Sequence, residues 1–305
     1  MSTGNETDFT LLGFFPEFKY ITAIVAIILL IYIAAFTGNT LLLLLIWLDS
    51  RLHTPMYFLL SQLSVMDLTL TSSIVPKMAA NFFSGWRNIS FLACGTQIFF
   101  SLTVAIAECI LITLMCFDRY VAICNPLRYS LIISPRVCAQ MAAMSWAGGA
   151  LTSLGHTAFT LHFQICNPRE IPHFFCEVMA VLRIVCEDIS AYEKAVVVTS
   201  ILVLLLPLSL ILSSYIIIFL AVLRMNSPEG RNKALATCTS HLCVVGLYFG
   251  PGMCIYMRPG SAKTPKLNQG LFLFGTVLTP LLNPLAYSLR NKEVLSALKK
   301  FIGRC

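Results

Sequence analysis

The most constraining feature of the sequence is a set of apolar runs, each long enough to cross a lipid bilayer, that carry no charged side chain. A helix needs roughly 20 apolar residues to span the hydrocarbon core. Strands of a membrane barrel are excluded, because they have only about 9–11 residues and alternate in polarity. The runs without Asp, Glu, Lys or Arg are Tyr20–Leu48, Val137–Gln164, Ala195–Leu223, Ala234–Met257 and Leu267–Leu289.

Two further apolar runs are interrupted by charge. Met56–Phe83 contains Asp67 and Lys77, and Cys94–Phe117 contains Glu108. Only 11% of the 305 residues are charged, against about 25% in an average soluble domain. The chain is therefore predicted to be an all-α membrane protein, a seven-transmembrane-helix bundle without internal repeats, and no nucleic-acid partner is expected.

The domain organisation and the orientation follow from the segments around the runs. Residues 1–19 are predicted to form an extracellular tail, 20–289 the bundle and 290–305 a cytoplasmic segment whose Asn291–Ile302 is a short amphipathic C-terminal helix. A small majority of the 21 Lys and Arg residues then falls on the cytoplasmic side, as the positive-inside rule requires. The glycosylation sequons at Asn5 and, with less weight, Asn88 fall outside.

Asp67 and Glu108 lie near the middle of their spans, where ionisable groups are costly and usually functional. Facing each other, they would form an anionic pocket for Na⁺ or a proton. The alternative is a hydrogen-bonded polar cluster with Asn39, Asn283 and Ser64. Both interpretations stay open at the level of sequence.

Prolines and one charged pair are candidates for conformational change. Pro207, Pro251 and Pro284 lie in the last three spans, where they are either tolerated kinks or hinges. Asp118 and Arg119 end the third span as either an interfacial ion pair or a latch that releases when helices move.

Four sequence strings identify a family. LHTPMYFLLSQLSVMD covers Leu52–Asp67, MCFDRYVAICNPLRY covers Met115–Tyr129, KALATCTSHL covers Lys233–Leu242 and PLLNPLAYSLRN covers Pro280–Asn291. With them the chain resembles, over nearly its whole length, an odorant (olfactory) receptor of the rhodopsin-like (class A) G protein-coupled receptors. The resemblance implies a non-enzymatic plasma-membrane receptor that binds small, mostly neutral volatile odorants and activates a heterotrimeric stimulatory G protein to raise cAMP.

The resemblance also assigns roles to residues. It implies disulfides Cys94–Cys176 and Cys166–Cys186, where the sequence alone allows other pairings. The sodium or polar core comprises Asp67, Glu108, Asn39 and Asn283. The G-protein switch comprises Asp118, Arg119, Tyr120, Tyr215, Pro284 and Tyr287.

The implied odorant pocket lies between the third to seventh helices and is mostly apolar with a few hydroxyls, which suits a small neutral ligand. No cofactor is expected apart from a possible Na⁺. The predicted lining residues are Ser101, Leu102, Ala105, Ile106, Thr152, His156, Thr199, Val203, Phe249, Tyr256, Leu273 and Thr276.

Other interpretations of the sequence are less favoured. His173, Cys176 and Glu177 have a spacing that suits a soft metal, but a disulfide at Cys176 would remove its thiolate, so no metal site is predicted. A non-olfactory class A receptor and, less favoured, a seven-span transporter are the remaining functional alternatives. No hydrolase, metalloprotease or phosphate-loop motif supports an enzyme.

Overall fold

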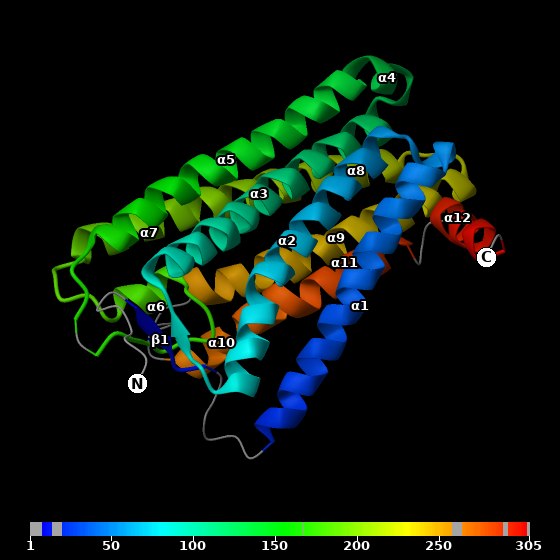
Figure 1. Cartoon of the computed structure of the whole chain (residues 1–305). Coiled ribbons are helices and arrows are strands. Elements are labelled where there is room, and N and C mark those ends of the chain that lie inside the picture. Colours follow the sequence, from blue (N-terminus) through cyan, green and yellow to red (C-terminus); the bar gives the residue numbers. More distant parts are fainter. Residues whose placement is uncertain (1–7, 14–19, 167, 258–263, 289–291, 304–305) are drawn as a thin grey trace.

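The computed structural model describes residues 8–13, 20–166, 168–257, 264–288 and 292–303. Long helices lie side by side in one bundle, as Figure 1 shows. They form because each apolar run must satisfy its own backbone hydrogen bonds when it leaves water. The bundle helices are α1 (Ile21–Leu48), α2 (Pro55–Ser84), α3 (Phe91–Cys124), α5 (Pro135–His162), α7 (Ser190–Ser200), α8 (Leu206–Leu223), α9 (Pro228–Tyr256), α10 (Pro265–Leu273) and α11 (Thr279–Ser288).

Two of the predicted spans are continuous rods with a π-helical turn inside. The turn η3 (Ile201–Leu205) joins α7 to α8, and η5 (Phe274–Leu278) joins α10 to α11. Pro207 lies two residues after the end of the first turn, whereas Pro251 and Pro284 lie inside α9 and α11. π turns mark irregular points in a helix, and here they occur in the fifth and seventh predicted spans, while α9 continues as an α-helix through Pro251.

By length and composition, six segments in the described part of the chain are apolar enough to cross a membrane. The 28-residue α5 is long enough but is not among them, because Gly, Ser and Thr lower its hydropathy. Its small residues have a packing role: a Cβ on Gly149 would lie 2.4 Å from the carbonyl oxygen of Thr103. The low hydropathy of α5 therefore reflects the close approach of α3 and α5.

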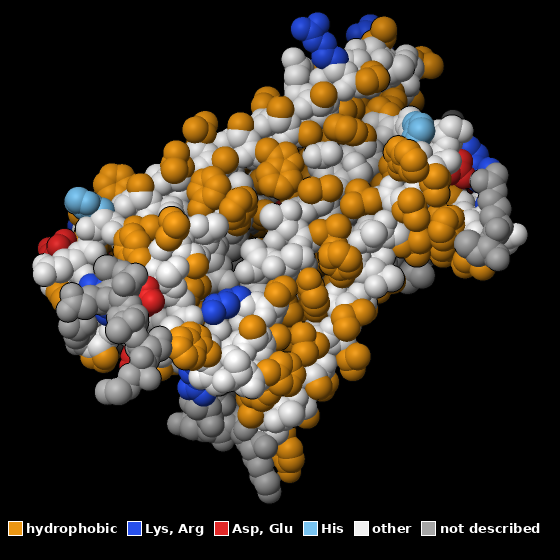
Figure 2. Space-filling model, in the orientation of Figure 1, with side chains coloured by type: hydrophobic (Ala, Val, Ile, Leu, Met, Phe, Trp, Pro, Cys, Tyr) orange, Lys and Arg blue, Asp and Glu red, His pale blue; other side chains and the backbone are white. Residues whose placement is uncertain are grey.

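The sides of the bundle present apolar side chains. Figure 2 shows hydrophobic groups over the flanks of the helices, with charged side chains toward the two ends. Leu30, Leu151 and Ile216 are 66%, 72% and 64% exposed. An exposed apolar surface of this extent is typical of a face that contacts lipid.

A small sheet at one end of the bundle differs from the all-helical expectation. The strand β1 (Phe9–Leu11) pairs antiparallel with β2 (Asn88–Ile89) and parallel with β3 (Glu170–Ile171). Phe9 and Leu11 are 0% and 1% exposed. Residues 9–11 of the predicted tail therefore form a strand, because two apolar side chains in alternate positions bury one of its faces.

Two disulfides lie at the same end. Cys94 at the start of α3 is bonded to Cys176, and Cys166 is bonded to Cys186. Both pairs are those that the family resemblance implies. The loop between them holds α6 (Val178–Leu182). We call this the disulfide end.

The opposite end carries α12 (Lys292–Ile302), η1 (Ser50–Leu52), η2 (Pro126–Arg128) and α4 (Tyr129–Ile132). The predicted amphipathic helix is present, and it buries Val294 and Ala297 against the bundle. Ile302, at the last turn, is 63% exposed. We call this the α12 end.

Candidate functional site

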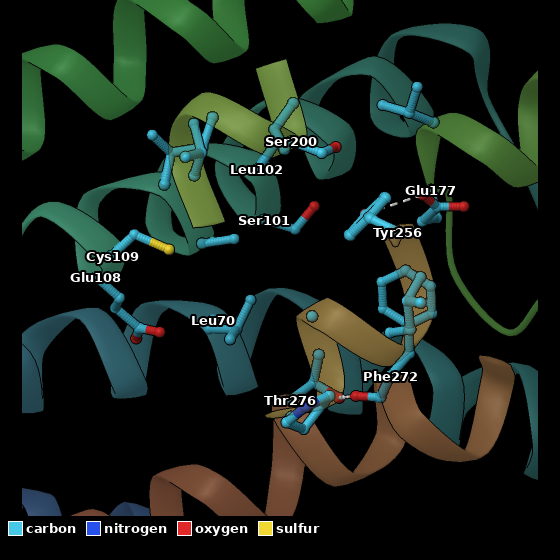
Figure 3. A pocket seen from close by; sticks show the side chains of 18 of the residues that line it. Leu70, Ser101, Leu102, Glu108, Cys109, Glu177, Ser200, Tyr256, Phe272 and Thr276 are labelled. Atoms are coloured by element: carbon cyan, nitrogen blue, oxygen red, sulfur yellow. Dashed lines mark hydrogen bonds between the residues drawn. The ribbon is translucent and has the colours of Figure 1, made fainter. Parts of the chain in front are cut away.

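A cavity of about 190 Å³ lies between the helices toward the disulfide end. Figure 3 shows Glu108 and Cys109 at one end of this first cavity and Tyr256 with Glu177 at the other. The remaining wall is almost wholly apolar, apart from a few hydroxyl groups such as that of Ser101. Such a lining favours a small neutral molecule over an ion.

Most of the predicted pocket residues line the first cavity. They come from α3, α5, α7, η3, α9 and η5, so one small space is built from segments far apart in the sequence. The predicted residues that line it are Ser101, Leu102, Ala105, Ile106, His156, Thr199, Val203, Tyr256 and Thr276.

Three predicted pocket residues do not line the cavity. The Thr152 hydroxyl donates to the Gly148 carbonyl 2.9 Å away within α5. Phe249 is 2% exposed and packs in the bundle core, and the partly buried Leu273 packs against the same core. Thr152, Phe249 and Leu273 are therefore not part of the wall of the first cavity.

The error at Phe249 has a simple cause in helix periodicity. The residues of α9 that line the cavity form adjacent pairs repeated every four residues, as one helix face requires. Tyr248 belongs to one of these pairs, whereas Phe249 is one residue past it. The Tyr248 hydroxyl donates to the carbonyl oxygen of Ala105, which joins α9 to α3. The α9 lining residues are Leu247, Tyr248, Pro251, Gly252, Ile255 and Tyr256.

The polar groups around the cavity already bond to the protein. The Ser101 hydroxyl donates to the Gln97 carbonyl at 2.7 Å, and the Thr276 hydroxyl to the Phe272 carbonyl at 2.8 Å. His156 bridges the Tyr192 hydroxyl at 2.9 Å and the Thr199 hydroxyl at 3.2 Å. Of these side chains, His156 has the most restricted orientation, because each of its ring nitrogens lies within hydrogen-bond distance of a neighbouring hydroxyl.

One of the two intramembrane carboxylates, Asp67, bonds to a predicted amide. The Asn283 side chain donates to both oxygens of Asp67, at 3.2 and 3.0 Å. Asn39 donates instead to the Pro280 carbonyl at 2.8 Å. In the described part of the chain, Glu108 Oε1 is buried without a hydrogen-bond partner, as are the side-chain oxygens of Asn39 and Asn283. Among the described residues, the side chains of this polar core therefore leave three oxygen atoms without a partner.

At the α12 end, the expected ion pair between Asp118 and Arg119 is absent. Among the described residues the ion pair within 4.0 Å is Asp49–Arg51. Asp118 accepts a hydrogen bond from the Tyr129 hydroxyl at 2.7 Å, and Arg119 donates to the sulfur of Met56. Consecutive helical residues point about 100° apart, so each finds a partner on a different element.

The other switch residues are divided between two contacts. The Tyr215 hydroxyl lies 2.9 Å from Nδ1 of His241, whose Nε2 lies 3.1 Å from the carbonyl oxygen of Ile112. Pro284 approaches Gly38, where an added Cβ would meet its ring at 3.6 Å. The sequence analysis missed His241, although a His inside an apolar span is a signal of a specific partner. Tyr120 is half-buried against the core, and the side chain of Tyr287 lies outside the described residues.

The metal alternative receives no support. Cys176 is oxidised in the disulfide with Cys94, so it offers no thiolate. Glu177 caps α6 by accepting from the Ala180 amide at 2.9 Å, and burial raises the pKa of its carboxyl group. Groups of His, Cys, Asp or Glu that could hold a metal are absent from the described residues.

Comparison with known proteins now identifies the family. A family model described as "Olfactory receptor" matches residues 28–304. The chain belongs to the olfactory receptor family. Olfactory receptor 2M5 from Homo sapiens is 47% identical over 100% of this chain and 98% of its own length. Olfactory receptor 2T27 from Homo sapiens (49% identity; 98% of this chain, 94% of the relative) and Olfactory receptor 2V1 from Mus musculus (48%; 97% and 94%) are similar to it as well.

Family membership settles several of the sequence predictions. The receptor is an odorant-sensing G protein-coupled receptor with a seven-transmembrane bundle, resident in the plasma membrane and not an enzyme. Its transmembrane helices and both disulfides have the expected places in the structure. The transporter and non-olfactory receptor alternatives are thereby excluded.

Proposed function

We propose that the receptor binds a small neutral odorant in the first cavity and, with its N-terminus outside and C-terminus inside the cell, activates a stimulatory G protein of the olfactory type to raise cAMP. The observation that carries this proposal is the cavity itself. It lies between several helices of the bundle, and its lining is nearly all apolar. An apolar odorant would gain free energy by leaving water there.

The few polar atoms suggest what the ligand carries. Ser101, Thr199, Thr276 and His156 line the cavity, and each already has a protein partner. A ligand with one hydrogen-bonding group can share such a hydroxyl through its second lone pair. The two carboxyl groups of the lining, Glu108 and Glu177, lie at opposite ends of the cavity, so the apolar middle offers a charged ligand no adjacent counterion.

A cavity-filling variant tests the site. Ala105→Phe would fill space beside the ligand and should lower the potency of active odorants at least tenfold in a cAMP assay on transfected cells. Leu151→Phe is the matched control, since Leu151 is 72% exposed on the lipid-facing side of α5. Surface amounts of both variants are measured by antibody labelling. Equal potencies for the two variants at equal surface amounts would refute the pocket assignment.

The resemblance also implies a Na⁺ ion in the polar core, and the residues present fit such an ion. Glu108 Oε1 and the Asn39 side-chain oxygen are buried without a partner among the residues that the structure describes, and oxygen atoms are the ligands that hard cations prefer. Asp67, Glu108, Asn39 and Asn283 would hold the ion, which would supply positive charge to two buried carboxylates. Asn283 would keep Asp67 in position through its two hydrogen bonds.

Glu108→Gln tests the ion separately from the odorant. The neutral variant should lose the dependence of thermal stability on NaCl, measured against KCl at equal ionic strength in purified receptor. Ser64→Ala serves as a control, because Ser64 is buried near the core without being assigned to the ion. A sodium effect of wild-type size in Glu108→Gln would contradict the site.

The orientation is tested by the sequons. Asn88 is exposed in β2, although its side-chain oxygen accepts a hydrogen bond from Thr10 at 3.3 Å, and Asn5 lies outside the described residues. If the N-terminus is extracellular, Asn5→Gln should remove a glycan that an endoglycosidase shift detects. If the wild-type chain carries no glycan and an N-terminal tag is found in the cytosol, the proposed orientation is wrong.

A further inference from the structure

A second cavity of about 310 Å³ lies beside the first, at the disulfide end. It is bounded by the loop that carries α6 and by α7, α9 and α10. Its wall is more polar than that of the first cavity, with His173, Arg183, Glu193 and Asn268 among the lining residues. Apolar groups such as Val197 complete it, so the space is amphipathic.

His173 is the unusual member of this wall. The residue is 5% exposed, yet among the described residues neither ring nitrogen has a hydrogen-bond partner. Buried polar side chains nearly always have a partner, and leaving one without costs free energy. An imidazole that lines a cavity without a partner therefore points to a ligand group that would complete it.

The ring is held rigidly in this position. It stacks on Phe174 with ring centroids 4.5 Å apart and meets Phe272 edge-on at 5.4 Å. The backbone amide of His173 donates to the Ile171 carbonyl at 2.8 Å, and its carbonyl accepts from the Gly13 amide at 3.2 Å. A side chain fixed in advance loses little entropy when a ligand binds.

The protonation state of His173 defines the complementary group. Burial, reinforced by the positive charge of Arg183, lowers the pKa of His173 to about 3, so the ring is neutral at physiological pH. A neutral imidazole offers one donor and one acceptor. A hydroxyl group is the smallest group that matches both, and the apolar wall would take an alkyl chain.

The two cavities are neighbours that have several lining residues in common. They share a wall, and within it the Tyr256 hydroxyl donates to Glu177 Oε1 across 3.4 Å (Figure 3). This distance is at the long end for a hydrogen bond. The residues that line both cavities are Glu177, Val196, Ser200, Ile255, Tyr256 and Phe272.

We propose that the second cavity is a separate binding site for small alcohols, in which His173 hydrogen-bonds the hydroxyl group and the alkyl chain packs against the α7 and α10 walls. The site is distinct from the first cavity, because its occupant would contact the loop residues Met179 and Leu182, which the first cavity does not reach. The second cavity would therefore select ligands that carry a hydroxyl group, whereas the neighbouring first cavity is mostly apolar.

Photo-crosslinking of purified receptor in lipid nanodiscs tests this proposal. The probe is a hexanol that carries a diazirine on its chain, and the control probe is the same molecule with hydrogen in place of the hydroxyl. Mass spectrometry then locates the crosslinks. Met179, Leu182, Val197 and Asn268 report the second cavity alone, whereas Ser101, Leu102, Ala105 and Cys109 report the first.

The alcohol probe should label second-cavity residues with a half-saturating concentration about fivefold below that of the control probe, the size of one neutral hydrogen bond. His173→Phe keeps the aromatic packing and should abolish this difference. His173→Gln keeps a donor and an acceptor and should retain it within about twofold. Loss of all labelling in His173→Phe would indicate misfolding. In that case the difference between the two probes in the wild type and in His173→Gln decides whether the proposal holds.

Equal half-saturation by the two probes in the wild type, or an unchanged difference in His173→Phe, would overturn the proposal. The first-cavity crosslinks are scored in the same samples. Their absence beside normal second-cavity labelling would count against the proposed odorant pocket and leave the alcohol site supported, so the two failures are distinguishable.

Discussion

The two ends of the bundle are held together in different ways. At the disulfide end, one disulfide joins the loop to α3 and a second closes the loop on itself. A three-stranded sheet joins β1 to β2 and β3, and Gln97 adds hydrogen bonds to the Ser73 carbonyl and the Cys176 amide. At the α12 end, hydrogen bonds between side chains connect the helices, as between Tyr215 and His241. One end resists rearrangement, while the other is held by contacts that can exchange.

The energies support that contrast. A disulfide that closes a long loop stabilises a fold by about 2–5 kcal/mol, whereas one intramolecular hydrogen bond contributes about 0.5–1.5 kcal/mol. Opening the α12 end therefore costs far less than opening the disulfide end. A receptor needs this asymmetry, because the ligand cavity must keep its shape while the opposite end changes.

The largest expected effect comes from removing the bond that anchors α3. Cys176→Ser opens a link between residues 82 apart in sequence, for which the loop-entropy relation gives about 4–5 kcal/mol. The variant should lose most surface expression and unfold well below the wild type in a thermal-shift assay. Cys254→Ser, at an exposed free cysteine, should behave as the wild type. A Cys176→Ser receptor with wild-type stability would remove the basis of the comparison.

The second test concerns α3, which connects the two ends. Gly149→Ala would place a Cβ 2.4 Å from the Thr103 carbonyl oxygen and 3.0 Å from Ala107, so α5 must move away from α3. Overpacking of this kind costs about 1–3 kcal/mol. Gly155→Ala in the same helix meets nothing within 4 Å and should be neutral or slightly stabilising. Equal thermal shifts for the two variants would show that the helices are not closely packed at Gly149.

The bundle itself could be predicted from the sequence, because charge-free runs of bilayer length allow few other folds. α1 and α8 end where their apolar runs end, at Leu48 and Leu223. The sheet could not be predicted, since strands of two or three residues such as β1 form only when a loop distant in sequence offers its edge. Phe9 and Leu11 show no pattern longer than one alternation.

The candidate site was predictable to the level of a helix face. Ser101, Leu102 and Ala105 were placed correctly because α3 is long and regular, whereas Phe249 was misplaced by one residue. The contacts of Asp118 and Arg119 were not predictable, because their partners Tyr129 and Met56 depend on how three elements pack. Local sequence gives the faces of helices, but tertiary packing selects the partners of polar groups.

A third test addresses the strength of a single contact at the α12 end. Tyr215→Phe removes the hydroxyl that lies 2.9 Å from His241 and should destabilise the receptor by about 1 kcal/mol. His241→Phe and the double variant complete a double-mutant cycle. The two single effects should not add, with a coupling of about 1 kcal/mol in thermal or chemical unfolding. Strict additivity would mean that the pair does not hold α8 to α9.

The smallest expected effect returns to the disulfide end and depends on pH. The pKa of His173 is lowered from 6.5 to about 3 in the folded receptor, so below pH 6.5 the unfolded chain binds a proton that the folded receptor does not. The contribution of this group to the free energy of unfolding is therefore highest well above pH 6.5, and it falls progressively as the pH drops through 6.5 toward 3. Between pH 7 and pH 6 the loss is about 0.7 kcal/mol by this linkage.

Glu177 works in the opposite direction, since burial raises its pKa and the folded receptor then gains stability as the pH falls. His173→Phe removes the first contribution and leaves the second. The thermal midpoint of the wild type should therefore fall from pH 7 to pH 6 relative to that of His173→Phe, while Cys254→Ser should follow the wild type. A pH dependence that is the same with and without His173 would show that the ring reaches solvent, and the disulfide end would then be less tightly closed than the comparison of the two ends requires.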